Sequence, residues 1–269
     1  MSSNSNDNTE TYEPFVESHP DEGADVLRSR MEADGYLFFR GLAAADEVLA
    51  VRRDVLALCA EAGWLDPSRD LMDGIVAPNM QPTSEGMPEY MAVYRRVLKQ
   101  LPRFHDFPTL PPLMAVARQL LASDDVLVHP RRIGRLTFPN NTDATTPAHQ
   151  DHFYIRGTVN TYSCWVPLGE CPMDLGGLAV LPGSHKRGFL EHTEKFPAAV
   201  GGRGVPTDNE TGWVASDFGL GDALFFHAYT IHKALPNLTP DRLRISTDNR
   251  YQRAGDDIDP GALKPHFNV

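Results

Sequence analysis

The chain has 269 residues, of which 41% are apolar and 23% are charged, and it carries a formal net charge of −11. This length and composition are typical of a globular protein with one large domain or two small ones. The acidic balance disfavours nucleic acids and anionic membranes as partners, because both bind concentrated positive charge. We therefore expect a small molecule as the partner, and a monomer or homodimer as the assembly.

Three further features narrow the class of protein. No apolar stretch approaches the roughly 20 residues of a membrane span, so no membrane association is expected. Residues 1–18 are polar and acidic, without the basic and apolar parts of a signal peptide, and predict a disordered tail. The three cysteines, Cys59, Cys164 and Cys171, lack the spacing of a disulfide framework or a thiolate zinc site. This cysteine usage is typical of a cytoplasmic protein.

We predict a single domain over residues 19–269, and residues 19–123 are its helix-rich support region. Apolar residues recur there at helical spacing, most regularly over residues 89–101. The apolar run 36–39, bounded by glycines, predicts a buried strand. The loops 66–88 and 190–211 are candidates for a cover over a site. The expected helices span residues 21–33, 46–63, 89–101 and 110–121.

Residues 124–253 change character and predict a β-structure, followed by a C-terminal extension over 254–269. Short β-rich runs alternate there with Gly, Pro and Asn turns, which is typical of a closed sandwich or jelly roll. Helices followed by strands, without βαβ alternation, predict helices packed on one face of this β-structure. The expected strands are 126–128, 133–138, 152–155, 162–167, 178–181, 212–214, 223–226, 230–232 and 242–251.

His149 and Asp151 are the first candidate metal ligands. Two residues apart on a strand, their side chains would lie on the same face. A second imidazole would complete the set of two histidines and one carboxylate that holds non-haem Fe(II) in oxygenases. Because the chain has ten histidines, this spacing also arises by chance and does not by itself establish a metal site.

Five motifs in a fixed order make the chain resemble the phytanoyl-CoA dioxygenase family of Fe(II)- and 2-oxoglutarate-dependent oxygenases. The resemblance extends from about Gly35 to Tyr251. It implies a double-stranded β-helix, a cupin-like jelly roll with helices packed on the larger sheet. The motifs are H-x-D, W-x-P-L, G-G-L-x-V-x-P-G-S-H-K, G-D-x-x-F-F-H-x-x-x-x-H and R-x-R-x-S.

The resemblance implies that His149 and Asp151 are iron ligands and leaves two candidates for the third, His227 and His232. In the family the later histidine, which precedes a Pro-Asn turn and an arginine strand, is the ligand. We therefore choose His232, and we interpret His227 as a structural histidine at the end of a strand.

The co-substrate 2-oxoglutarate needs a cation for its far carboxylate, and a guanidinium suits it best because it binds a carboxylate at two points. Alignment on the Ile-Ser pair of the last strand favours Arg242 for this role, whereas alignment on the closing Arg-Tyr pair favours Arg244. We place Arg244 first. Ser246 is a candidate for a further contact with the same carboxylate, and Trp165 for a wall of its pocket.

The resemblance implies oxidation of a small organic molecule with O2 and release of succinate and CO2. Hydroxylation of a secondary metabolite is our prediction, and desaturation, epimerisation and ring formation are the alternatives. The charge pattern favours a neutral or cationic substrate over a coenzyme A ester, since the sequence has no basic cluster larger than pairs such as Arg131-Arg132 to bind the phosphates. Two rivals remain: a cupin-like metal-dependent isomerase or lyase without 2-oxoglutarate, and a non-catalytic binding barrel.

Overall fold

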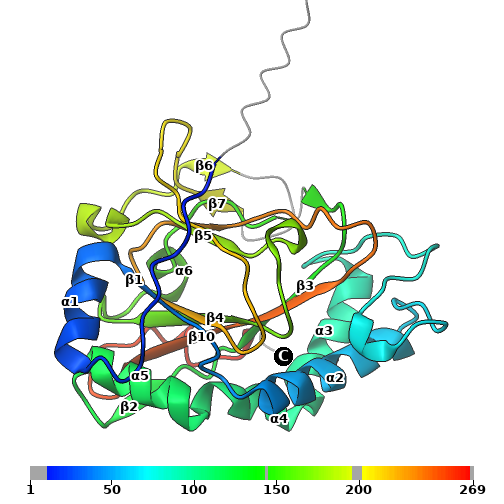
Figure 1. Cartoon of the computed structure of the whole chain (residues 1–269), viewed down its shortest axis with the longest axis horizontal. Helices are drawn as coiled ribbons and strands as arrows, with labels where there is room; N and C mark the ends of the chain where they lie inside the picture. Colours follow the sequence, from blue (N-terminus) through cyan, green and yellow to red (C-terminus); the bar gives the residue numbers. More distant parts are fainter. Residues whose placement is uncertain (1–10, 143–144, 196–201, 267–269) are drawn as a thin grey trace, which may run out of the picture.

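The computed structural model describes residues 11–142, 145–195 and 202–266. At its centre lies a six-stranded antiparallel sheet with the strand order β1-β8-β4-β10-β2, in which β3 also pairs with β10. Figure 1 shows helices beneath this sheet and a second β-layer above it. The strands of the large sheet are β1 (Tyr36–Phe39), β2 (Val126–Val128), β3 (Ile133–Thr137), β4 (Tyr162–Pro167), β8 (Ala223–His227) and β10 (Arg244–Arg253).

The opposing layer is small and is held together partly by single bridges. β5 (Leu178–Val180) pairs with β9 (His232–Ala234), and His149 bridges to His232 at the end of β9. β6 (Glu194–Lys195) pairs with β7 (Arg203–Gly204) on the same side of the molecule in Figure 1. Two antiparallel layers that face each other around a common interior form a jelly roll, so the predicted fold class is confirmed.

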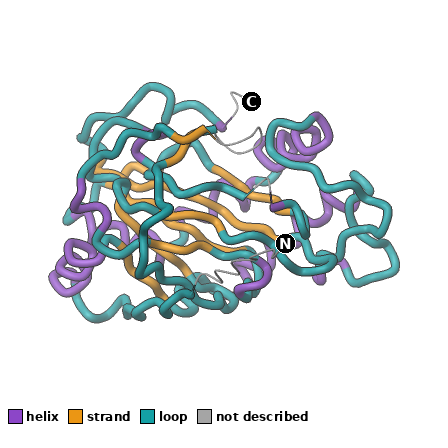
Figure 2. Tube along the Cα trace, turned by 90° about the horizontal axis from the view of Figure 1, so that it is seen from above, coloured by secondary structure: helices purple, strands orange, loops and turns teal. Residues whose placement is uncertain are grey.

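Helices cover the outer face of the large sheet, and their apolar side chains merge with those of the sheet into one large core. In Figure 2 the strands lie side by side in a central layer that is flanked by helices. The helices are α1 (Ala24–Asp34), α2 (Ala45–Glu61), α3 (Pro88–Gln100), α4 (Pro102–Asp106), α5 (Pro111–Leu121) and α6 (His152–Ile155). The short 3-10 turns are η1 (Leu71–Asp73), η2 (Phe107–Thr109), η4 (Met173–Leu175) and η5 (Ser184–Arg187).

The apolar run of β1 follows from its position between two cores. Leu37 and Phe39 join the cluster under the helices, whereas Tyr36 and Phe38 join the cluster inside the barrel. All four side chains are buried, and burial stabilises such a residue by roughly 1.5–3 kcal/mol. A strand covered on both faces therefore shows a continuous apolar run and no alternation with polar residues.

Gly35 makes the sharp turn from α1 into β1. Its φ of +78° is left-handed, and its N–H donates to the Met31 carbonyl and so ends the helix. A Cβ at this position would lie 2.4 Å from Nδ1 of His185. Only glycine meets both conditions without strain.

The predicted helices and most predicted strands are present, but three expectations differ. Residues 152–155 form the short helix α6, because the Asp151 backbone is already helical and begins a turn. Residues 212–214 form no strand; Val214 makes only single bridges to Val180 and Glu13. The predicted disordered tail is wrong for residues 11–18, because Phe15 is buried inside the barrel and the segment bridges to the sheets. Residues 1–10 lie outside the described residues.

Candidate metal and 2-oxoglutarate site

His149 and His232 face each other across the small layer. Their backbones exchange two hydrogen bonds, of 3.0 Å and 3.1 Å, and their ring centroids lie 4.2 Å apart. In each ring Nδ1 donates to a carbonyl two residues earlier, at 2.8 Å to Pro147 and 3.0 Å to Thr230. These bonds place the ring proton on Nδ1 and leave the Nε2 lone pair free to bind a metal.

The carboxylate of Asp151 completes this group. Its Oδ1 lies 3.6 Å from Nε2 of His149 and 3.9 Å from Nε2 of His232. The three potential ligand atoms lie within 4.8 Å of one another, and all three residues are buried. The sequence therefore identified residues that the fold brings together. The geometric reason was wrong, since Asp151 lies in a helical turn and does not continue a strand from His149.

Arg250 and Ser163 also hold the Asp151 carboxylate. The Arg250 guanidinium donates to Oδ2 at 3.0 Å and 3.2 Å and to Oδ1 at 3.2 Å, and the Ser163 hydroxyl donates to Oδ2. Burial by itself would raise the pKa of Asp151, but the Arg250 charge and the two imidazoles hold it well below its usual range. The carboxylate is therefore ionised and oriented before any ligand arrives.

The His232 ring is also suited to act as a neutral ligand. Burial, followed by the nearby His149, lowers the pKa of His232 to about 3. The ring of Phe226 packs against it, with centroids 4.3 Å apart. The neutral imidazole, with one nitrogen lone pair free, is the form of histidine that binds a transition metal.

Arg244 lies inside the barrel together with the metal-ligand candidates. It lines a small recess with His149, Asp151, His232 and Trp165. The guanidinium donates to Thr137 at 2.7 Å and to Ser246 at 3.4 Å, and its Cζ lies 5.9 Å from the centre of the Trp165 ring.

Arg244 lacks a counter-ion within the described part of the chain. Its Nε is buried without a hydrogen-bond partner, and no described carboxylate lies within ion-pair distance. Burial lowers its pKa. An unpaired buried guanidinium is costly, so this position fits the far carboxylate of a dicarboxylic co-substrate.

The two alternative candidates of the sequence lie elsewhere. Arg242 is half-buried and bridges through its backbone to Ile75, outside the recess that contains Arg244. His227 ends β8, where its Nδ1 accepts the backbone N–H of Tyr229, and it is not part of the metal-ligand group. Burial lowers the pKa of His227 to about 4.

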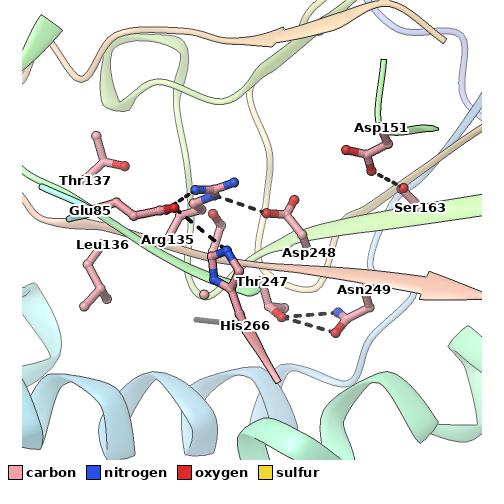
Figure 3. A network of polar contacts seen from close by, with 12 residues as sticks. Glu85, Arg135, Leu136, Thr137, Asp151, Ser163, Thr247, Asp248, Asn249 and His266 are labelled. Atoms are coloured by element: carbon pink, nitrogen blue, oxygen red, sulfur yellow. Dashed lines mark hydrogen bonds and ion pairs between the residues drawn. The ribbon is translucent and has the colours of Figure 1, made fainter. Parts of the chain in front are cut away.

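A cavity of about 240 Å³ opens beside the metal-ligand group. Apolar side chains (Ile133, Ile155) and charged ones (Glu85, Arg131, Arg135, Arg250) line it, together with Tyr154 and His266. Figure 3 shows Arg135 between Glu85 and Asp248, and His266 beside Glu85, 3.8 Å away. Sequence reasoning missed Glu85, Arg135 and His266, because no motif marks them and they come from distant segments. It used Arg250 only to align the last strand and gave it no role in the site.

The comparison with known families decides the class of this site. Residues 31–246 match the model of the family described as phytanoyl-CoA dioxygenase (PhyH). The chain belongs to this family. It is thus a member of the Fe(II)- and 2-oxoglutarate-dependent oxygenases, and the predicted family and enzyme class are confirmed.

Individual relatives agree with this membership. The chain is 27% identical over 276 residues to the 1-deoxypentalenic acid 11-beta-hydroxylase of Streptomyces exfoliatus, covering 96% of this chain and 91% of that protein. The 2-oxoglutarate-dependent carbocyclase SnoK of nogalamycin biosynthesis has a similar fold (TM-score 0.63, 19% identity, 92% of this chain and 90% of that one). So has the epimerase SnoN, solved with Fe3+ and 2-oxoglutarate (TM-score 0.58, 22% identity, 88% and 86%).

Among the described residues, no helix combines the length and the apolar character that a membrane span requires.

Proposed function

We propose that this protein hydroxylates a small organic molecule of secondary metabolism, using Fe(II), 2-oxoglutarate and O2 and releasing succinate and CO2. One observation carries the proposal: a buried group of two imidazoles and one carboxylate shares a recess with a buried arginine that has no counter-ion among the described residues. The first half of this arrangement fits iron, and the second fits 2-oxoglutarate.

In this proposal His149, Asp151 and His232 hold the iron on one face and leave three positions for 2-oxoglutarate and O2. Arg244 binds the far carboxylate of 2-oxoglutarate, with Ser246 beside it and Trp165 as a wall. Bound iron and 2-oxoglutarate supply the oxidising power, whereas the protein supplies position and environment.

The adjacent cavity performs the remaining task, which is to place a substrate C–H bond next to the iron. The cavity shares His149 and Asp151 with the metal-ligand group, so its occupant lies directly against the metal position. Ile133 and Ile155 give it an apolar wall against which a bound substrate would exclude water. Exclusion of water protects a reactive oxidant from side reactions.

Ring formation and epimerisation are the second candidate outcomes, and desaturation is a further one. They are favoured by the named activities of two proteins with this fold, a carbocyclase and an epimerase. The rival isomerase or lyase without 2-oxoglutarate would leave the buried Arg244 charge without a function.

Anaerobic titration with Fe(II) and 2-oxoglutarate tests the proposed function. We expect the visible charge-transfer band of the iron–2-oxoglutarate chelate, and its loss in Asp151→Ala. With candidate metabolites and O2, mass spectrometry should find one added oxygen atom and an equal amount of succinate. Absence of the band in the parent protein, or succinate formation by Asp151→Ala at the parent rate, would refute the proposal.

We also propose that residues 19–269 act as one domain, as a monomer or homodimer, in the cytoplasm. β1 from the helix-rich region pairs with β8 of the jelly roll, which supports one folding unit. Cys59, Cys164 and Cys171 are buried free thiols, as expected in a reducing compartment. Cell fractionation and light scattering test these points; a secreted protein or a larger assembly would contradict them.

A further inference from the structure

Arg131 is a charged group in the substrate cavity that the proposed chemistry does not use. It lies in the turn between β2 and β3, is half-buried, and lines the cavity together with Ile133, Tyr154 and Ile155. No hydrogen bond or ion pair joins its guanidinium to any described residue. The two acidic residues that line the cavity, Glu85 and Asp151, are paired with Arg135 and Arg250.

The other arginines around the iron position each have an anionic partner or a place for one. Arg135 lies between Glu85 and Asp248, and Arg250 binds Asp151. Arg244 would take the far carboxylate of 2-oxoglutarate. Among the described residues, Arg131 is therefore the cavity arginine whose guanidinium has no anionic group in direct contact.

A substrate that fills the cavity must remove water from this charge. Removal of water from an unpaired guanidinium costs several kcal/mol. A carboxylate on the substrate would compensate this desolvation cost by forming charge-assisted hydrogen bonds with the guanidinium. A cationic substrate would gain no such contact and would be repelled by Arg131. We expected a neutral or cationic substrate from the overall acidic charge of the chain. That expectation did not consider the unpaired positive charge of Arg131 in the cavity.

The cavity also limits the size and the number of charges. Its volume of about 240 Å³ lies below the roughly 300–1,000 Å³ of pockets for drug-sized ligands. A single unpaired cation matches a monoanion, and several phosphates would need several cations. Ile133 and Ile155 match an apolar body.

From this balance we infer that the substrate is a compact, apolar monocarboxylic acid whose carboxylate binds Arg131. The inference rests on the proposed function in one respect, namely that the molecule bound in the cavity is the substrate. The preference of the cavity for a carboxylate depends on Arg131 alone.

Three probes with one hydrocarbon body and different charges test the inference: 1-adamantanecarboxylic acid, its amide, and 1-adamantanemethylamine. Calorimetry measures their affinities for the anaerobic protein loaded with Fe(II) and 2-oxoglutarate. We expect the acid to bind at least about tenfold more tightly than the amide, because charge-assisted hydrogen bonds exceed neutral ones. The protonated amine should bind most weakly.

Arg131→Met should remove the preference for the acid while leaving the amide affinity within about threefold of the parent, since only a charge contact is lost. Arg131→Lys should retain part of it. Arg95→Met, which removes the same charge from the exposed side of α3, is the control and should preserve it.

Equal affinities for acid and amide, an acid preference that survives Arg131→Met, or binding of none of the probes would each overturn the inference. Failure of the proposed function has a different signature. Calorimetry detects the probes whether or not the chelate band forms, so a missing band together with an intact acid preference would refute only the oxygenase chemistry.

Discussion

Replacement of Arg244 by methionine should weaken 2-oxoglutarate binding without destabilising the protein. In the complex, loss of a buried guanidinium leaves a buried carboxylate unpaired, which costs about 2–5 kcal/mol. A loss of about 3 kcal/mol corresponds to a roughly 100-fold higher Kd. In the free protein the balance is different, because Arg244 is itself buried, and the described part of the chain offers neither a counter-ion for its charge nor a partner for its Nε. Removal of such a group relieves about 1–3 kcal/mol, which offsets the lost hydrogen bond to Thr137.

Anaerobic titration of the Fe(II)-loaded protein with 2-oxoglutarate measures the first effect, and urea unfolding of the metal-free protein measures the second. Arg242→Met is the matched control; its half-buried side chain lies outside the recess, so its Kd should stay within about threefold of the parent. Arg244→Lys keeps the charge but loses the two-point geometry and should lie between the two. A higher Kd for Arg242→Met but not for Arg244→Met would refute the role of Arg244. A loss of more than about 3 kcal/mol of stability in Arg244→Met would instead give Arg244 a structural role.

Three further predictions follow from the same geometry. Arg250→Met leaves the Asp151 charge buried and unpaired, so the metal-free protein should lose about 3–5 kcal/mol of stability. Co2+ should stabilise this variant more than it stabilises the parent, and a metal-free melting temperature equal to the parent's would contradict the prediction. His232→Ala should weaken Co2+ binding by more than the roughly 10–100-fold cost of losing an outer-sphere partner, whereas His227→Ala should leave it nearly unchanged; the reverse order in calorimetry would refute the ligand choice. Burial lowers the pKa of His129 to about 4. As the pH falls from about 6.5 to about 4, the unfolded chain therefore binds a proton that the folded chain does not, and the free energy of unfolding should fall by up to about 3 kcal/mol. Urea unfolding across this pH range should show a smaller fall for His129→Gln, and an equal fall in both proteins would contradict the prediction.

The order of motifs along the chain was sufficient to identify the family, the jelly roll and the three metal-ligand candidates. Each motif is local, and its residue types already express a chemical requirement, such as an imidazole and a carboxylate two residues apart. The buried strand β1 was equally visible, because a strand covered on both faces needs a continuous apolar run.

The sequence placed Arg244 before Arg242 only through an alignment of motifs, and the tertiary structure adds a physical reason for that preference. Two arginines that are two residues apart point the same way on an ideal strand, so their spacing does not separate them. The register does, because β10 begins at Arg244, which lies opposite Thr137 of β3 and above the recess, whereas Arg242 precedes the strand and bridges to Ile75.

The environment of the ligands was also beyond local reading. Arg250 lies 99 residues from Asp151, yet it orients that carboxylate, since β4 and β10 bring Ser163 and Arg250 side by side. Asp151 itself reaches the histidines from a helical turn, although its spacing suggested a strand. Arg131 is only one member of a basic pair in the sequence, and it becomes a lining residue of the cavity when the turn between β2 and β3 meets α6. The sequence by itself determined which chemical groups are present, because ligand types and apolar periodicity are local properties. Which of these groups pair with one another, and which charged group is free to bind a substrate, depended on contacts between distant segments that only the folded chain creates.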